Sequence, residues 1–178
     1  MPEAIEMPES HGPEELPFMI PVAVTLSILA VLVAIATLFG HRAATEELYL
    51  QTKATDQWSF YQAKNMRLHA MQSVADLLDT LEPVQKEKAE AVREKYLQEA
   101  ERYRQEMDGI GEQAKEFEKE RELVGRREDR FDASEVVLEI ALIICSLTLL
   151  TRRKFFWYSG IALGVAGLGV MISGFLLR

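Results

Sequence analysis

The stretch PFMIPVAVTLSILAVLVAIATLFG, residues 17–40, decides the fold of this chain because it is apolar throughout and carries no charge. As an α-helix, a segment of this length rises about 35 Å, which is enough to cross a hydrocarbon core of about 30 Å. Residues 1–16 contain five glutamates and no Lys or Arg, unlike the basic start of a secretory signal peptide. We therefore expect residues 1–16 to be an acidic tail and residues 17–40 to be a retained transmembrane helix.

Two further apolar stretches lie near the C-terminus. Residues 155–177 are uncharged and begin with the aromatic run FFWY, whose rings favour the membrane interface. Residues 134–151 form a shorter stretch that contains two glutamates. We predict that both stretches cross the membrane as helices. The alternative for residues 134–151 is a re-entrant or interfacial segment, which would move the C-terminus to the opposite side.

The region between the first two spans, residues 41–133, is charged and favours helix, with 16 Lys and Arg against 21 Asp and Glu. This negative balance disfavours nucleic acid as a partner. Pro83 is poorly tolerated inside a helix, and apolar residues recur at spacings of four and three on both sides of it. The seam is weaker before the proline, where Gln57 and Lys64 interrupt it. Its positions are Leu50, Ala54, Gln57, Tyr61, Lys64, Leu68, Met71, Ala75 and Leu78 before the proline, and Tyr96, Ala100, Tyr103, Met107, Ile110, Ala114, Phe117, Arg121 and Val124 after it.

The pattern predicts an all-α membrane protein with three transmembrane helices. A long antiparallel coiled-coil hairpin, residues 41–133 with its turn near residue 83, joins the first span to the second. Lys and Arg near spans tend to stay in the cytoplasm, and they flank the spans on the hairpin side while the N-terminal tail has none. We therefore expect the hairpin in the cytoplasm and the N-terminus outside. The basic cluster at residues 152–154 favours the opposite orientation.

Six aromatic residues of the hairpin are candidate contacts with another copy or another subunit. They are Trp58, Phe60, Tyr61, Tyr96, Tyr103 and Phe117. A stalk of two helices is thin, so an aromatic ring that does not pack within the hairpin is exposed unless a partner covers it. Packing within the hairpin and contact with a partner both remain open.

The third apolar stretch carries two stripes of small residues, which allow membrane helices to approach closely. One stripe is Gly160, Gly164, Gly167 and Gly174, and the other is Ala162, Ala166, Gly169 and Ser173. We expect one stripe to pack within the chain and the other to contact a second subunit. The general enrichment of glycine in membrane helices is the alternative explanation.

Glu139 is the best single candidate for chemistry, because a carboxylate within a span is costly and often marks a proton, ion or partner site. Glu135 lies one helical turn earlier. The structural alternatives are that Glu135 forms a capping box with Asp132 at a helix N-terminus, and that Glu139 reaches the interface or pairs with Arg42 or Arg130.

The sequence contains no recognisable catalytic or cofactor motif. Cys145 is the single cysteine, so an intramolecular disulfide is excluded, and the three histidines are too far apart in sequence to suggest a metal site. Neither a phosphate-binding glycine loop nor a nucleophile elbow is present. We therefore expect neither enzymatic activity nor a bound cofactor.

Three segments carry a resemblance to a known family. They are GHRAATEELYLQTKATDQWSFYQAKNMR at residues 40–67, RFD at residues 130–132 and TRRK at residues 151–154, and the most specific part is ATDQWSFYQAK at residues 54–64. In these segments the chain resembles a bacterial membrane protein family, domain of unknown function 4337 (DUF4337). The resemblance implies three spans and a multi-pass location in the bacterial inner membrane, and it implies no activity.

Two functions fit these observations. The first is a non-enzymatic structural or accessory subunit that forms homo-oligomers, or docks to partner membrane-protein subunits, through its hairpin and its third span. The second is an oligomeric ion channel or proton-translocating element in which Glu139 faces a pore.

Overall fold

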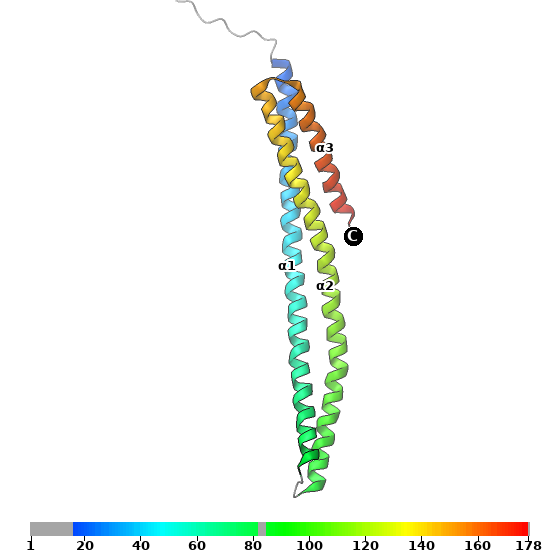
Figure 1. Ribbon diagram of the computed structural model, residues 1–178. Coiled ribbons are helices and arrows are strands. Elements are labelled where there is room, and N and C mark those ends of the chain that lie inside the picture. Colours follow the sequence, from blue (N-terminus) through cyan, green and yellow to red (C-terminus); the bar gives the residue numbers. More distant parts are fainter. Residues whose placement is uncertain (1–15, 82–84, 178) are drawn as a thin grey trace, which may run out of the picture. The chain divides into compact units, whose positions relative to one another are not determined.

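The computed structural model describes residues 16–81 and 85–177, and within these ranges it contains three α-helices and no strand (Figure 1). Helix α1 spans Leu16–Thr80, α2 spans Lys86–Thr151 and α3 spans Lys154–Leu176. The predicted all-α class is confirmed for these residues. The predicted acidic tail, apart from Leu16, and the predicted turn at Pro83 lie outside the described residues.

All three helices are long and apolar enough to cross a membrane. Helix α3, with 23 residues, is close to the roughly 20 residues that a span requires. Helices α1 and α2, with 65 and 66 residues, are about three times longer. The apolar stretches predicted at residues 17–40 and 134–151 are therefore parts of longer continuous helices.

The described residues divide into two compact units. The apolar unit consists of residues 16–41 and 127–177, and the charged unit consists of residues 42–81 and 85–126. Helices α1 and α2 contribute to both units, whereas α3 belongs to the apolar unit alone.

The core of the apolar unit follows a seven-residue period. The fully or almost fully buried residues include Val22, Leu29 and Ala36 on α1, and Phe131, Leu138 and Cys145 on α2. A period of seven keeps one side of a helix facing its neighbour over many turns. At one end of this core, Phe131 packs against Phe39 of α1 and Phe175 of α3, with ring centroids 5.8 and 5.0 Å away. All three helices therefore meet in one aromatic cluster.

In the charged unit, the α1 and α2 segments lie side by side and run in opposite directions. The pairs that join them are Asp79 with Arg93, Lys64 with Glu106, Trp58 with Glu118, and Gln51 with Arg121. The residue number on α1 falls along this series while the number on α2 rises, as expected of antiparallel helices. Leu68, Ala100 and Met107 form a buried cluster between the two segments, and Tyr61, Met71 and Tyr103 pack against it.

Candidate functional site

The first small-residue stripe of α3 forms a close helix contact in the apolar unit. Its members Gly160, Gly164, Gly167 and Gly174 are all buried. A Cβ atom at Gly160 would lie 2.9 Å from Cβ of Cys145 and 3.1 Å from the carbonyl oxygen of Ala141. A Cβ atom at Gly167 would lie 2.8 Å from Cγ of Leu138. Glycine at these positions permits an approach of α3 to its neighbours that a larger residue would prevent.

A hydrogen bond that the sequence did not reveal supports this contact. The hydroxyl of Ser134, which is fully buried in α2, donates to the carbonyl oxygen of Gly167 in α3 at 3.0 Å. Hydroxyl side chains commonly join membrane helices in this way. The available signal was the position of Ser134, three residues after the buried Phe131 and four before the buried Leu138.

The second small-residue stripe of α3 faces away from the rest of the chain. Ala162, Ala166 and Gly169 are exposed and Ser173 is half-buried. A Cβ atom at Gly169 would meet nothing within 4 Å. The predicted contact of this stripe with a second subunit stays a prediction.

The two candidate glutamates in the apolar part of α2 lie in different surroundings. Glu135 is half-buried and accepts a hydrogen bond of 2.7 Å from the hydroxyl of Thr37 in α1. The capping-box interpretation of Glu135 is wrong, because α2 begins at Lys86 and the backbone N–H groups around residue 135 are already used within the helix. Glu139 is exposed and makes no hydrogen bond or ion pair with the described residues.

The six aromatic candidates of the charged unit separate into two groups. Trp58, Tyr61, Tyr96, Tyr103 and Phe117 are half-buried, whereas Phe60 is 51% exposed. The indole N–H of Trp58 donates to Glu118 at 2.9 Å, and its ring meets that of Tyr61 edge to face at 5.6 Å. Most of these rings therefore stabilise the contact between α1 and α2. The exposed ring of Phe60 has the amine of Lys64 at 5.1 Å from its centroid, and its predicted contact with a partner stays a prediction.

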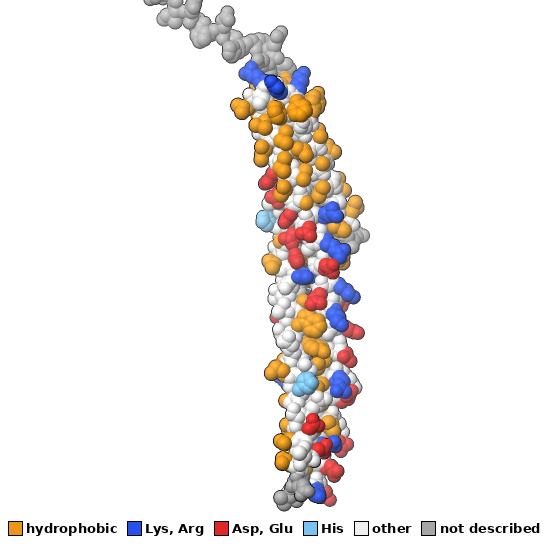
Figure 2. All heavy atoms as spheres, viewed as in Figure 1, with side chains coloured by type: hydrophobic (Ala, Val, Ile, Leu, Met, Phe, Trp, Pro, Cys, Tyr) orange, Lys and Arg blue, Asp and Glu red, His pale blue; other side chains and the backbone are white. Residues whose placement is uncertain are grey.

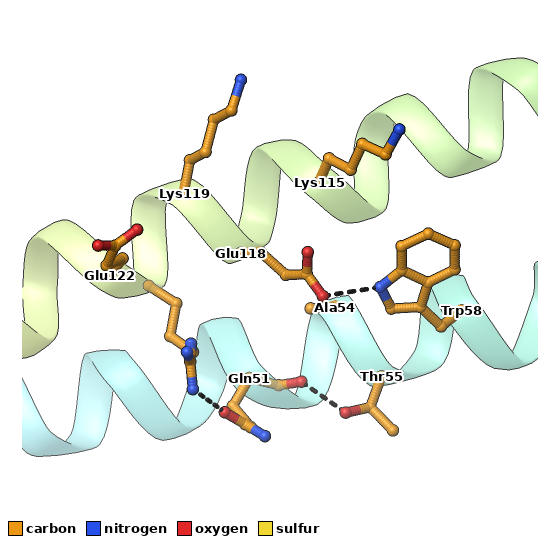
Figure 3. Close-up of a pocket in the computed structure, with 9 residues that line it drawn as sticks. Gln51, Ala54, Thr55, Trp58, Lys115, Glu118, Lys119 and Glu122 are labelled. Carbon is orange, nitrogen blue, oxygen red and sulfur yellow. Dashed lines mark hydrogen bonds between the residues drawn. The ribbon is translucent and has the colours of Figure 1, made fainter.

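An open hollow of about 560 Å³ lies beside Trp58 (Figure 3). It is lined by Gln51, Ala54, Thr55 and Trp58 of α1 and by Lys115, Glu118, Lys119, Arg121 and Glu122 of α2. The amine ends of Lys115 and Lys119 extend away from α1, while Glu118 and Trp58 point toward each other. Arg121 donates to the side-chain oxygen of Gln51 at 2.6 Å.

Among the described residues, the one hydroxyl group that lines this hollow is bonded within its own helix. A hydroxyl acts as a nucleophile when it lies within hydrogen-bond reach of a general base. The hydroxyl of Thr55 donates instead to the backbone carbonyl of Gln51 at 2.9 Å. No group of three or more His, Cys, Asp or Glu residues that could hold a metal ion occurs in residues 16–81 and 85–177.

Ion pairs on the surface of the charged unit perturb two carboxyl groups. A hydrogen bond from Lys64 lowers the pKa of Glu106, and the nearby charges of Lys64 and Arg102 act in the same direction. A hydrogen bond from Arg126, at 2.6 Å, lowers the pKa of Glu122. Both shifts arise from pairs that join neighbouring helices or successive turns, which is typical of a solvated helical surface.

Comparison with known proteins supports a family assignment. No curated protein and no solved structure matches the chain. The model of a family described as a domain of unknown function (DUF4337) matches residues 18–177, which include almost all of the three helices. The resemblance noted in the sequence is thereby confirmed, and the chain belongs to the DUF4337 family.

Proposed function

We propose that this chain is a non-enzymatic, multi-pass membrane subunit that assembles with other copies or docks to partner membrane-protein subunits. The observation that carries the proposal is the difference between the two stripes of α3. One stripe packs within the chain at distances that only glycine permits, and the other, which also consists of small residues, is exposed and unoccupied around Gly169. Membrane helices associate through such surfaces, so the exposed stripe suits a neighbouring subunit.

The charged unit contributes an antiparallel coiled-coil hairpin to this proposal. Support comes from the four antiparallel side-chain pairs and from the buried cluster of Leu68, Ala100 and Met107 between the segments. We place the chain in the bacterial inner membrane with this hairpin in the cytoplasm. The bacterial assignment rests on the family resemblance, and the orientation rests on the cations that flank the spans on the hairpin side.

Native mass spectrometry of the full chain, extracted in mild detergent from the membrane in which it is expressed in its own host, tests the proposal. A single integer multiple of the 20.2 kDa chain, or a fixed ratio with other chains, is the expected result. Gly169→Leu should reduce this mass, because it removes the α3 contact. Gly169→Ala, which keeps the residue as small as its neighbours Ala162 and Ala166, should retain the assembly. A monomeric wild-type chain would contradict the proposal.

A second function, an oligomeric ion channel or proton-translocating element, is favoured by one observation. Glu139 lies in the apolar part of α2, is exposed, and has no partner among the described residues. A carboxylate in that position is most stable where it faces water or another protein chain within the membrane. Proton or cation flux into vesicles that contain the purified assembly should then be abolished by Glu139→Gln. Equal flux in the variant and the wild type, or no flux in either, would contradict the channel function, and only the structural function would then remain.

A further inference from the structure

The outer side of α1 in the charged unit carries an apolar stripe that α2 does not cover. We name it the outer stripe, and its members are Phe60, Ala63, Ala70, Val74 and Leu77 of α1, together with Leu81 directly after the end of the helix. Leu77 and Leu81 are each 56% exposed and Phe60 is 51% exposed. Exposed apolar residues are ordinary when they are scattered singly, but a continuous row marks a contact surface.

The spacing of the outer stripe indicates which kind of surface covers it. Its members follow one another at alternating steps of three and four residues, with Arg67 in the one position that remains. This is the spacing of a coiled-coil seam, whose natural partner is another helix. The packed side of α1, which includes Tyr61, Leu68 and Met71, has the same spacing and faces α2. Helix α1 therefore has two seams, and α2 occupies only one.

The two helices of the charged unit differ sharply in charge near their connection. Residues 60–81 of α1 include 4 Asp, Glu, Lys and Arg residues, whereas the 22 residues 86–107 of α2 include 12. Figure 2 shows red and blue side chains along the α2 side of this unit and orange ones on the α1 side. The outer surface of α2 is suited to water, and the outer stripe of α1 is not.

We propose that the outer stripe is covered by the outer stripe of a second copy of this chain, with the two α1 helices parallel and in register. This proposal rests on the proposed function, since it specifies one surface through which that assembly forms. Copies inserted in one membrane in the same orientation present their charged units on the same side, so their α1 helices run in the same direction. A two-fold axis along the pair then places Val74 on Val74 and Leu77 on Leu77.

The chemistry of the stripe favours a second copy over a charged partner. Apart from Arg67 the stripe is uncharged, so a copy of itself is complementary in every other position. A basic helix would gain no ion pair there, and an acidic helix would gain one only at Arg67 while its other charges lost hydration. Arg67 stands opposite its own counterpart in this arrangement. A single polar residue in a seam lowers the stability of a coiled coil but specifies its register.

Disulfide crosslinking of the full chain in its native membrane tests the proposal. Cys145 is fully buried, so the wild-type chain is a suitable background. Val74→Cys, in the centre of the stripe, should give a disulfide-linked product of twice the chain mass on mild oxidation, because a disulfide requires Cα atoms within about 7 Å. Asp76→Cys is the matched control. It is exposed in the same turn but lies on the polar side of α1, and it should remain monomeric.

The remaining outcomes separate this proposal from the proposed function. If the wild-type mass is an integer multiple and neither Val74→Cys nor Ala70→Cys crosslinks, the stripe is not the contact between copies, although the assembly is real. Crosslinking of Val74→Cys to a chain of different mass would assign the stripe to another protein. Equal crosslinking of Val74→Cys and Asp76→Cys would indicate random collision and overturn the proposal. A monomeric wild-type mass would overturn both.

A second, independent variant tests whether the two α1 helices are paired in register. Arg67→Leu removes the one repulsive position of the parallel, in-register pair, and it should lower the concentration at which the dimer dissociates in detergent by tenfold or more. An unchanged or higher dissociation concentration would exclude this register. The helical content of each variant, measured by circular dichroism, establishes that it folds as the wild type does.

Discussion

The apolar unit and the charged unit use glycine in opposite ways. In the apolar unit, a Cβ atom at Gly160 would meet the backbone of α2 at 3.1 Å, so the helices approach each other only because the side chain is absent. In the charged unit, a Cβ atom at Gly109 would meet nothing within 4 Å, and one at Gly111 would make an ordinary contact of 3.6 Å with the ring of Tyr61. Glycine is therefore a packing requirement at Gly160 and only a weak helix former at Gly109.

This difference in helix packing reflects the surroundings for which each unit is suited, the lipid bilayer for the apolar unit and water for the charged unit. Within a bilayer the lipid is as apolar as the side chains, so helices gain by close backbone approach and by hydrogen bonds such as Ser134 to Gly167. In water, burial of apolar side chains supplies the stabilisation, and the charged unit accordingly buries Leu68 and Met107 between its helices. One continuous helix, α1, takes part in both kinds of packing.

The largest effect is expected from Leu68→Ala in the charged unit. Leu68 is 5% exposed, and loss of a buried leucine side chain typically costs about 2–5 kcal/mol of unfolding free energy. Leu48→Ala is the control, because Leu48 is 67% exposed and its loss should cost less than about 0.5 kcal/mol. Thermal unfolding of the purified full chain, followed by circular dichroism, measures both. Equal losses would contradict the assignment of the core.

The next largest effect is expected from Gly160→Ala, which should lower the free energy of unfolding by about 1–3 kcal/mol. The added methyl group overlaps atoms that cannot rotate away. Gly169→Ala on the same helix should show no such loss, since the space around it is open within the chain. Protease resistance of the apolar unit in detergent compares the two variants. A neutral Gly160→Ala would show that α3 is not held as closely as described.

Gly109→Ala should change stability in the opposite direction. With open space at the Cβ position, the helix propensity of alanine adds about 0.5–1 kcal/mol to the unfolding free energy. Hydrogen exchange at amides in the charged unit should therefore slow. A destabilised Gly109→Ala variant would mean that another chain contacts this position in the assembly, and it would weaken the contrast between the two units.

The smallest effect is expected from acidification, through two carboxyl groups of the charged unit. Ion pairing lowers the pKa of Glu106 and Glu122 in the folded chain, so their contribution to stability is complete above the unfolded pKa of about 4.3 and is lost as the pH falls through the folded values. Both groups are exposed, so the loss is small. The double variant Glu106→Gln with Glu122→Gln should show a weaker decline of helix stability between pH 5 and pH 2, measured by circular dichroism. An identical acid profile would assign the decline to other carboxylates.

The sequence by itself determined which segments are helices and which of them can cross a membrane, because both properties depend on residues that are close together in the chain. Hydropathy over some twenty residues marks a helix that can cross a membrane, and the spacing of apolar residues marks the side of a helix that becomes buried. Both signals were legible at residues 17–40 and 155–177, and the all-α class followed from them. Leu68, Ala100 and Met107, which occupy predicted seam positions, form the buried cluster of the charged unit.

Only the tertiary structure decided which surface meets which. Two stripes of α3 have similar composition, and the shape of Leu138 and Cys145 on α2 selects the one that contains Gly160 and Gly167. The partner of Glu135 is Thr37, which lies 98 residues away in the chain, so no local spacing predicted the bond. Contacts of this kind depend on the positions of side chains on distant helices, and these positions exist only once the helices have packed.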